Sequence, residues 1–186
     1  KNSLIAKTQP DQPVVEAFRG LRTALSFTMK THDRGCILIT SCAPGDGKSF
    51  VSSNLAVILA DKSRRTLLID ADMRRGKLRR AFGVRRNALG LSDALTGDCT
   101  FEEAVSETDI ENLCFISTGK RPPNPAELLD SKPFADLVEW ANSAFDVVVI
   151  DAPPVLAVTD PLILARHSAV NLLVVKHTAT SEVEIR

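Results

Sequence analysis

Residues 41–49 read Ser-Cys-Ala-Pro-Gly-Asp-Gly-Lys-Ser, and they follow a strand-like run and open a helix-like one. Small residues and glycines in this setting let successive backbone N–H groups surround phosphate oxygens, and the helix N-terminus adds partial positive charge. Lys48 is placed to reach the β- and γ-phosphates of a nucleotide, and the Ser49 hydroxyl to bind Mg²⁺. The pattern departs from its usual form at Cys42, where a glycine is typical. We expect the nucleotide-binding residues to be Pro44, Gly45, Asp46, Gly47, Lys48, Ser49 and Phe50.

Strand-like and helix-like segments alternate around this loop. The strand-like runs are short and apolar and occupy residues 36–40, 66–70, 113–117, 147–151 and 170–176. Helix-like segments occupy residues 14–29, 48–61, 131–143 and 160–167, with shorter ones at 77–82, 91–95 and 101–105. This alternation predicts an α/β fold of the P-loop NTPase type, with a mostly parallel sheet flanked by helices on both faces. Residues 1–13 are polar with two prolines and are expected to form a linker, which leaves residues 14–186 as a single domain.

Three aspartates stand at strand ends. Asp70 and Asp72 close the run at 66–70, and Asp151 closes the run at 147–151. The carboxyl ends of parallel strands form the ligand-binding edge of such a sheet. Mg²⁺ takes one or two carboxylates beside phosphates and water, so a third carboxylate is available as a base or to orient water. We therefore expect a nucleotide and Mg²⁺ here, with the ion near Ser49 and Asp151.

The composition narrows the function further. The 186 residues carry 23 Lys and Arg against 23 Asp and Glu, and zero net charge argues against nucleic acid as a partner. No window holds about 18 consecutive apolar residues, so no membrane span is expected. Residues 74–86 hold seven basic side chains and no acid, while residues 98–111 hold six acids and no base. These blocks are either solvated faces, or two surfaces that meet between subunits, or, for the basic block, a docking site for an acidic substrate segment.

From residue 14 to about residue 176 the chain resembles the cytoplasmic catalytic domain of bacterial tyrosine kinases, the BY-kinase family of capsule and exopolysaccharide export. The phosphate loop carries the resemblance together with residues 67–75, 90–97, 119–129 and 151–160. It implies an ATP- and Mg²⁺-dependent protein tyrosine kinase that phosphorylates a tyrosine-rich tail on a neighbouring subunit. By the same resemblance Lys48, Asp70 and Asp72 are catalytic, and Asp72 joins Ser49 and Asp151 as a residue that organises Mg²⁺. Asp70 is the expected base, although the division between Asp70 and Asp72 stays open.

The resemblance also implies partners. Glu16, Arg19 and Arg22 are similar to the helix motif that assembles family members into a ring-like homo-oligomer. The same pattern is equally typical of an amphipathic surface helix with i,i+3 ion pairs. Further implied partners are a membrane-spanning polysaccharide co-polymerase segment, fused or separate, and a cognate phosphatase. The implied location is the cytoplasmic side of the bacterial inner membrane, the domain itself being soluble.

The chain contains no tyrosine, so it has no tyrosine acceptor of its own. It begins at Lys1 and is expected to be a piece of a longer protein whose tyrosine-rich tail lies elsewhere. Two alternatives remain. A ParA/MinD-type ATPase would carry an additional lysine early in the phosphate loop, where this chain has Ala43. A nucleotide-gated assembly scaffold would bind ATP with the same residues without transferring phosphate.

Overall fold

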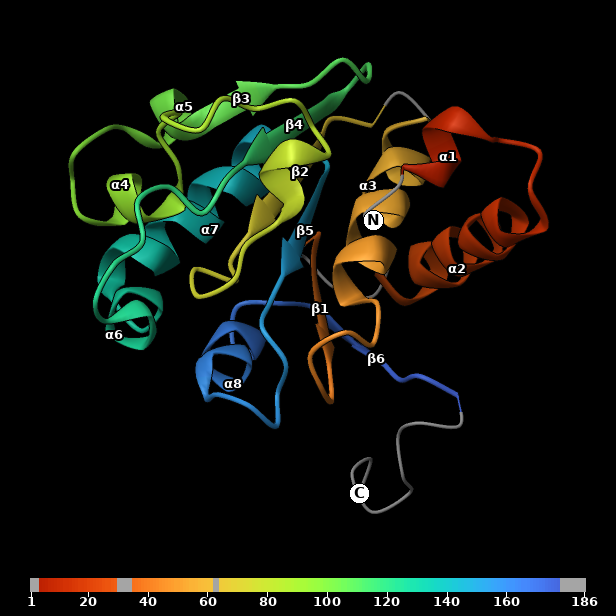
Figure 1. The fold of residues 1–186 in the computed structure, drawn as a ribbon. Helices are drawn as coiled ribbons and strands as arrows, with labels where there is room; N and C mark the ends of the chain where they lie inside the picture. The colour runs from red at the N-terminus through yellow and green to blue at the C-terminus, as the bar shows by residue number, and fades with distance from the viewer. Residues whose placement is uncertain (1–3, 30–34, 62–63, 178–186) are drawn as a thin grey trace.

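The computed structural model describes residues 4–29, 35–61 and 64–177, and within them the chain forms a three-layer α/β sandwich (Figure 1). Six strands make one sheet in the order β3-β4-β2-β5-β1-β6. All neighbours pair in parallel except β3 and β4, which are antiparallel. The strands are β1 (Cys36–Ser41), β2 (Thr66–Asp70), β3 (Val105–Glu107), β4 (Leu113–Ile116), β5 (Val147–Asp151) and β6 (Val170–Val174).

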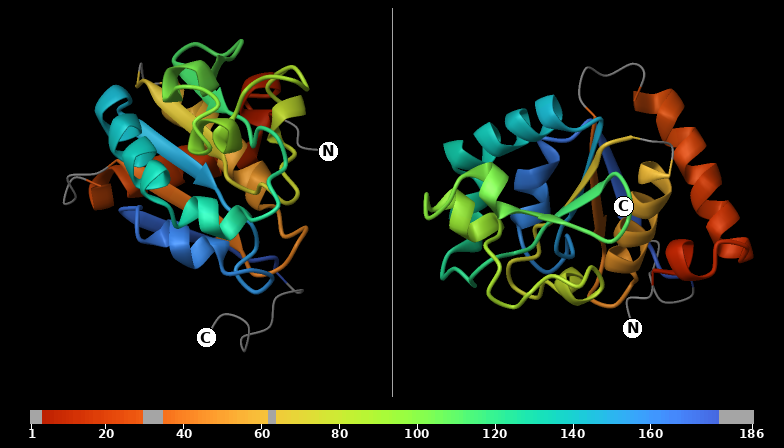
Figure 2. Two further views of the ribbon diagram at one scale, coloured as in Figure 1. Left: turned by 90° about the vertical axis from the view of Figure 1, so that its left-hand side faces the viewer. Right: turned by 90° about the horizontal axis from the view of Figure 1, so that it is seen from above.

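Alternation along the buried strands divides the core into two layers. In β1, Ile37 and Ile39 face one side of the sheet, and Cys36 and Leu38 face the other. All four side chains are at most 1 % exposed, which explains why this strand reads as a continuous apolar run. Figure 2 shows the sheet between its two helical layers when the molecule is viewed from above.

The helices divide between these faces. Ile37 and Ile39 face α1 (Ile5–Thr8), α2 (Pro13–Met29) and α3 (Lys48–Ala60). The opposite face is covered by α4 (Leu91–Leu95), α5 (Phe101–Ala104), α6 (Pro125–Leu129), α7 (Lys132–Ala144) and α8 (Asp160–Ala165). A single 3₁₀ turn, η1 (Leu78–Arg80), follows β2. None of the described helices combines the length and apolar character needed to cross a membrane.

The predicted fold class is confirmed, and the strands at 66–70 and 147–151 have the predicted bounds. Two short elements were not anticipated. Residue 105 was assigned to a helix, but that helix ends at Ala104, and the half-buried β3 begins at once. No element was assigned to residues 119–129, where Pro125 opens α6 and its missing N–H costs nothing.

The N-terminal residues also differ from the expected open linker. Residues 5–8 form α1, and Leu4 and Ala6 are each only 8 % exposed. The Ala6 backbone N–H donates to Asn54 Oδ1 of α3 over 2.9 Å. These contacts attach the segment to the first helical layer. The domain boundary at residues 13 and 14 remains a prediction.

The candidate site lies at the carboxyl ends of three central strands. β1, β2 and β5 are neighbours, and Asp70 lies opposite Asp151 in the register of β2 and β5. Backbone hydrogen bonds beyond the strand ends keep the following loops together, from Ala71 N to Asp151 O (2.9 Å) and from Val155 N to Ser41 O (2.8 Å). The phosphate loop and all three aspartates therefore share one edge of the sheet.

Candidate nucleotide-binding and catalytic site

Residues of the phosphate loop itself fix its backbone conformation. Gly45 and Gly47 have φ values of +96° and +104°, a region that side chains with a Cβ rarely adopt. Asp46 Oδ2 accepts the Ala43 backbone N–H over 2.7 Å, which closes the turn from within. Helix α3 begins directly after Gly47, so its first N–H groups face the loop as the sequence predicts.

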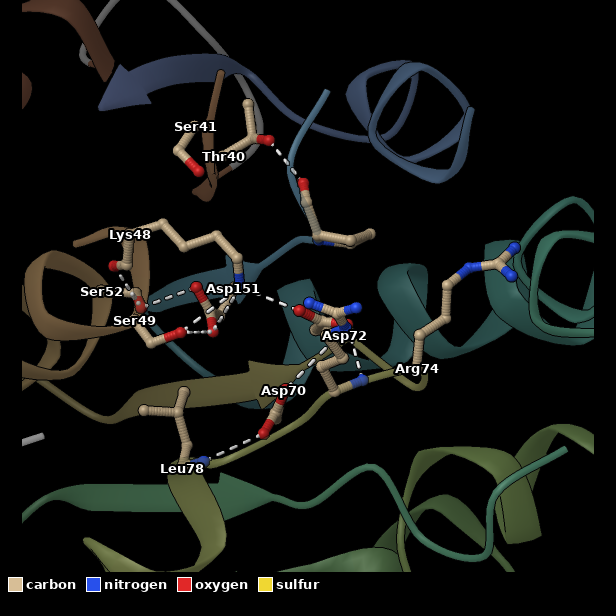
Figure 3. Close-up of polar contacts among 12 residues, drawn as sticks. Thr40, Ser41, Lys48, Ser49, Ser52, Asp70, Asp72, Arg74, Leu78 and Asp151 are labelled. Carbon is tan, nitrogen blue, oxygen red and sulfur yellow. Dashed lines mark hydrogen bonds and ion pairs between the residues drawn. The ribbon is translucent and has the colours of Figure 1, made fainter. Parts of the chain in front are cut away.

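Lys48 lies between two carboxylates (Figure 3). Its Nζ is 3.1 Å from Asp72 Oδ2 and 3.6 Å from Asp151 Oδ2. Asp151 Oδ2 also accepts the Ser49 hydroxyl over 2.8 Å, and its Oδ1 accepts the Ser52 hydroxyl over 3.0 Å. The structure thus brings Lys48, Ser49, Asp72 and Asp151 into one cluster, as expected from the sequence. Ser52 is an addition that the spacing of the motif did not reveal.

Burial and neighbouring charges shift the pKa values of Lys48 and Asp151 in opposite directions. Burial alone would lower the pKa of Lys48, but the carboxylates of Asp151, Asp72 and Asp70 outweigh it and raise that pKa above its ordinary value. Burial raises the pKa of Asp151, while Lys48 and the two serine hydroxyls oppose the rise. The lysine therefore stays charged at neutral pH and is available to an anionic ligand.

A cavity of about 420 Å³ opens beside the cluster. Its lining comes from three segments at the sheet edge, the first of which runs into α3: Pro44, Gly45, Gly47, Lys48, Ser49 and Phe50; Asp72, Arg74, Arg75 and Lys77; and Pro153, Pro154, Ala157 and Val158. Asp46 is absent from this lining because its carboxylate turns back to Ala43. The three basic residues after Asp72 were not assigned to the site from sequence, although the basic block at 74–86 was the available signal.

The donor set of the cavity suits Mg²⁺. One hydroxyl, from Ser49, and the carboxylates of Asp72 and Asp151 stand at its wall or directly behind it. In the described ranges no group of three or more His, Cys, Asp or Glu side chains is arranged to hold a metal ion alone. An incomplete protein donor set is what Mg²⁺ uses when nucleotide phosphates and water supply its remaining ligands.

Asp70 lies outside the cavity and binds backbone N–H groups. It is 1 % exposed and does not line the cavity. Its Oδ1 accepts the Asp72 N–H over 3.3 Å and its Oδ2 accepts the Leu78 N–H over 3.2 Å. Gly76 is needed here, because a Cβ at that position would lie 2.9 Å from Asp70 Oδ2 and closer still to Thr118. Burial, with Asp151 as a second cause, raises the pKa of Asp70 to about 8. This geometry favours Asp72 over Asp70 as the carboxylate that meets a ligand.

An ion pair with one buried partner links the loop after β2 to α8. Arg74 Nε and Nη2 donate to the two oxygens of Asp160 over 3.0 and 3.1 Å, and the Asp160 side chain is fully buried. The hydrogen bond with Asp160 raises the pKa of Arg74. The pair fastens the loop after β2 to the start of α8.

Replacing Arg74 with alanine should therefore destabilise the fold. The change strands a buried carboxylate, and we expect a loss of about 1–3 kcal/mol in the free energy of unfolding, since Arg74 itself is partly exposed. Urea denaturation measures it. Arg166→Ala is the matched control because Arg166 and its partner Asp130 are both more than half exposed, and it should cost at most about 1 kcal/mol. Equal losses for the two variants would contradict a structural role for the Arg74–Asp160 pair.

The α2 residues lie apart from the cavity. Arg19 pairs with Glu16 one turn earlier, and both are solvent-accessible. Arg22 Nη1 donates to Ile58 O at the end of α3 over 3.0 Å and lies 3.8 Å from Asp61. Arg22 thus has a role within the chain, between α2 and α3, that the helix motif did not reveal. The oligomer contact of all three residues remains a prediction.

Comparison with known proteins agrees with this site. Residues 35–181 match the AAA domain family. The chain is 44% identical over 183 residues to the putative tyrosine-protein kinase EpsB of Ralstonia nicotianae. It is 40% identical over 185 residues to the tyrosine-protein kinase wzc of Salmonella typhimurium. These matches cover 98% and 100% of this chain but only 24% and 26% of the relatives, so the chain spans about a quarter of their length.

Solved structures give the same result over a larger share of each relative. The kinase domain of Escherichia coli tyrosine kinase ETK superposes with a TM-score of 0.94 at 36% identity, covering all of this chain and 73% of that one. The BceF tyrosine kinase domain gives 0.90 at 44% identity, covering all of this chain and 75% of that one. MinD of Pyrococcus horikoshii, complexed with Mg-ADP, gives 0.64 at 26% identity over 75% of this chain and 56% of that one. With its phosphate loop, its strand-end aspartates and these matches along the whole of its own length, the chain belongs to the AAA domain family and to the bacterial tyrosine kinase (BY-kinase) domains.

Proposed function

We propose that this chain transfers the γ-phosphate of ATP to tyrosine hydroxyls on protein segments. The observation that carries the proposal is the convergence of Lys48, Ser49, Asp72 and Asp151 at the 420 Å³ cavity. A charged lysine beside a helix N-terminus binds phosphate, and clustered oxygen donors suit Mg²⁺. The cavity lining adds Arg75 and Lys77, whose charge favours a triphosphate.

Each residue of the cluster has a distinct task in the proposed reaction. The N–H groups of the phosphate loop and the Lys48 ammonium bind the phosphates and neutralise charge that develops during transfer. Ser49 and Asp151, with Asp72 close by, would hold Mg²⁺, which would supply positive charge beside the phosphates. Positioning and charge neutralisation supply most of the acceleration, because phosphoryl transfer requires little covalent chemistry from the protein.

We assign to Asp72 the role of the base that removes the proton of the tyrosine hydroxyl. The resemblance had given this role to Asp70. Asp72 lines the cavity and contacts Lys48, whereas Asp70 is buried behind it and holds two backbone N–H groups. A base must reach the proton that it removes, so geometry takes precedence. Asp70 then acts as a positioning residue that shapes the loop from Asp72 to Leu78.

The experiment that tests the proposed activity uses Mg²⁺-ATP and a tyrosine-bearing peptide. Mass spectrometry should find phosphotyrosine on the peptide and none on a peptide with phenylalanine in its place. Free phosphate without phosphotyrosine would favour the MinD-like ATPase alternative. Nucleotide binding without any turnover would favour a nucleotide-gated scaffold.

The wider setting is proposed from the resemblance and from the relatives. We infer a ring-like homo-oligomer on the cytoplasmic side of the bacterial inner membrane. It would act with a membrane-spanning polysaccharide co-polymerase segment, with a tyrosine-rich tail as substrate and a cognate phosphatase to reverse the modification. In this role phosphorylation regulates the polymerisation and export of exopolysaccharide or capsule.

Arg19 offers the cleanest test of the proposed ring. Arg19→Ala should lower the oligomer mass measured by light scattering, because the side chain is accessible and its partner within the chain, Glu16, is solvent-exposed. Arg22→Ala is less informative because it also removes the bond to Ile58. Arg86→Ala makes the same charge change at an exposed position outside α2 and serves as the control. An unchanged mass for Arg19→Ala would count against α2 as the assembly helix.

A further inference from the structure

A second cavity of about 370 Å³ adjoins the phosphate site, and its lining has an unusual composition. Arg74, Arg121, Pro122, Pro123 and Pro125 form it, with no carboxylate among them. Arg74 lines both cavities, so the two lie on either side of this residue. Figure 3 shows the Arg74 side chain pointing away from Lys48, out of the phosphate cluster.

The chain neutralises only part of the charge in this second cavity, because Arg74 pairs with Asp160 whereas Arg121 has no ion pair among the described residues. Arg74 uses Nε and Nη2 for Asp160, which leaves Nη1 without a partner in the described ranges. Arg121 is exposed and forms no ion pair with any residue that the structure describes. Asp160 is fully buried and so compensates Arg74 from inside the fold. The surface of the cavity therefore presents two guanidinium groups to a ligand.

The three prolines indicate which further chemical features a ligand of this cavity would need. Their rings give an apolar floor, and none of the three can donate a backbone hydrogen bond. Such a floor accepts an aromatic ring or an extended apolar backbone, while guanidinium groups bind carboxylates in a two-pronged geometry. An acidic peptide with an aromatic side chain complements both features.

We propose that this Arg74–Arg121–proline cavity is the docking subsite for the acceptor segment, and that it selects tyrosines flanked by Asp or Glu. The inference rests on the proposed kinase function and specifies its substrate class. Of the three interpretations of the basic block, it favours the docking of an acidic segment, with Arg121 as an additional contributor from the loop after β4. Arg75 and Lys77 line the phosphate cavity but not the second cavity, so we assign them to nucleotide binding.

The test compares two fluorescein-labelled peptides that differ only in the residues around a central tyrosine, glutamates in one and glutamines in the other. Fluorescence anisotropy with the full chain and Mg²⁺-ADP measures binding, and phosphotyrosine formation is measured separately with Mg²⁺-ATP. The chain should bind the glutamate peptide about three- to fivefold more tightly, as expected for a partly exposed charge pair. Arg121→Gln should reduce this ratio to about one, and Arg121→Glu should invert it in favour of the glutamine peptide.

Arg86→Gln is the matched control, since it removes the same charge from an exposed position that lines neither cavity. It should keep the preference of the parent. Equal binding of the two peptides by the parent, or an unchanged ratio in Arg121→Gln, would overturn the docking subsite while leaving the kinase function intact. A glutamate preference that depends on Arg121, without any phosphotyrosine, would support the subsite and count against the kinase function.

Discussion

Replacing Lys48 with methionine is expected to lower the rate of phosphotransfer by at least about a hundredfold, the usual effect of removing one charge-stabilising group. Methionine has a similar length but no charge. The Nζ lies 3.1 Å from Asp72 and 3.6 Å from Asp151, so its loss leaves two buried carboxylates facing each other and the phosphates. The loss of the positive charge and the two carboxylates left without a cation both disfavour an anionic substrate.

The same variant should also lose the stabilisation that nucleotide gives the folded chain. At a ligand concentration of 100 times Kd this stabilisation is about 2.7 kcal/mol, and it falls as Kd rises. Each variant is compared with itself, with and without Mg²⁺-ATP, so that a change in intrinsic stability does not interfere. Lys132→Met is the control, because Lys132 is exposed and pairs only with Asp136 of its own helix. An unchanged transfer rate in Lys48→Met would contradict the assignment of the site.

The second large effect is expected for Asp72→Asn. If Asp72 takes the proton of the tyrosine hydroxyl, the amide should lower kcat by about 10²–10⁴-fold. Asp70→Asn should keep a rate at least about tenfold higher than that of Asp72→Asn, because Asp70 does not line the cavity. It should instead lower the melting temperature, because an amide cannot accept both the Asp72 and Leu78 N–H groups.

Steady-state kinetics and a thermal melt of both variants test this division. The reverse result, an active Asp72→Asn and an inactive Asp70→Asn, would restore Asp70 as the base. Equal loss of activity in both variants would place the two carboxylates in one functional unit and contradict separate roles.

The sequence was most informative where local chemistry and fold agree. The phosphate loop, the central strands and the convergence of Lys48, Ser49 and Asp151 follow from a glycine-rich turn between strand and helix and from apolar runs that end in acids. Parallel pairing brings such ends to one edge whatever the details of the loops. These features were predicted because each depends on few residues close together in sequence.

Other features depend on contacts that spacing does not encode. The roles of Asp70 and Asp72 were not separable, because what distinguishes them is the backbone of Leu78 and the space left by Gly76. Helix α1 was missed because its four residues are stabilised by packing on α3 rather than by their own propensity. Arg121 was not assigned to a site because only the fold brings it to the same cavity as Arg74.

The most direct test of the central claim is the fate of the γ-phosphate in a single turnover. Excess protein is mixed with γ-labelled ATP, Mg²⁺ and a glutamate-flanked tyrosine peptide, and the label is divided between peptide and free phosphate. We predict that the label appears on tyrosine in the parent chain, that Lys48→Met abolishes this transfer, and that a phenylalanine peptide receives none. Label released only as free phosphate in the presence of the tyrosine peptide would contradict the assignment of this site to tyrosine phosphorylation.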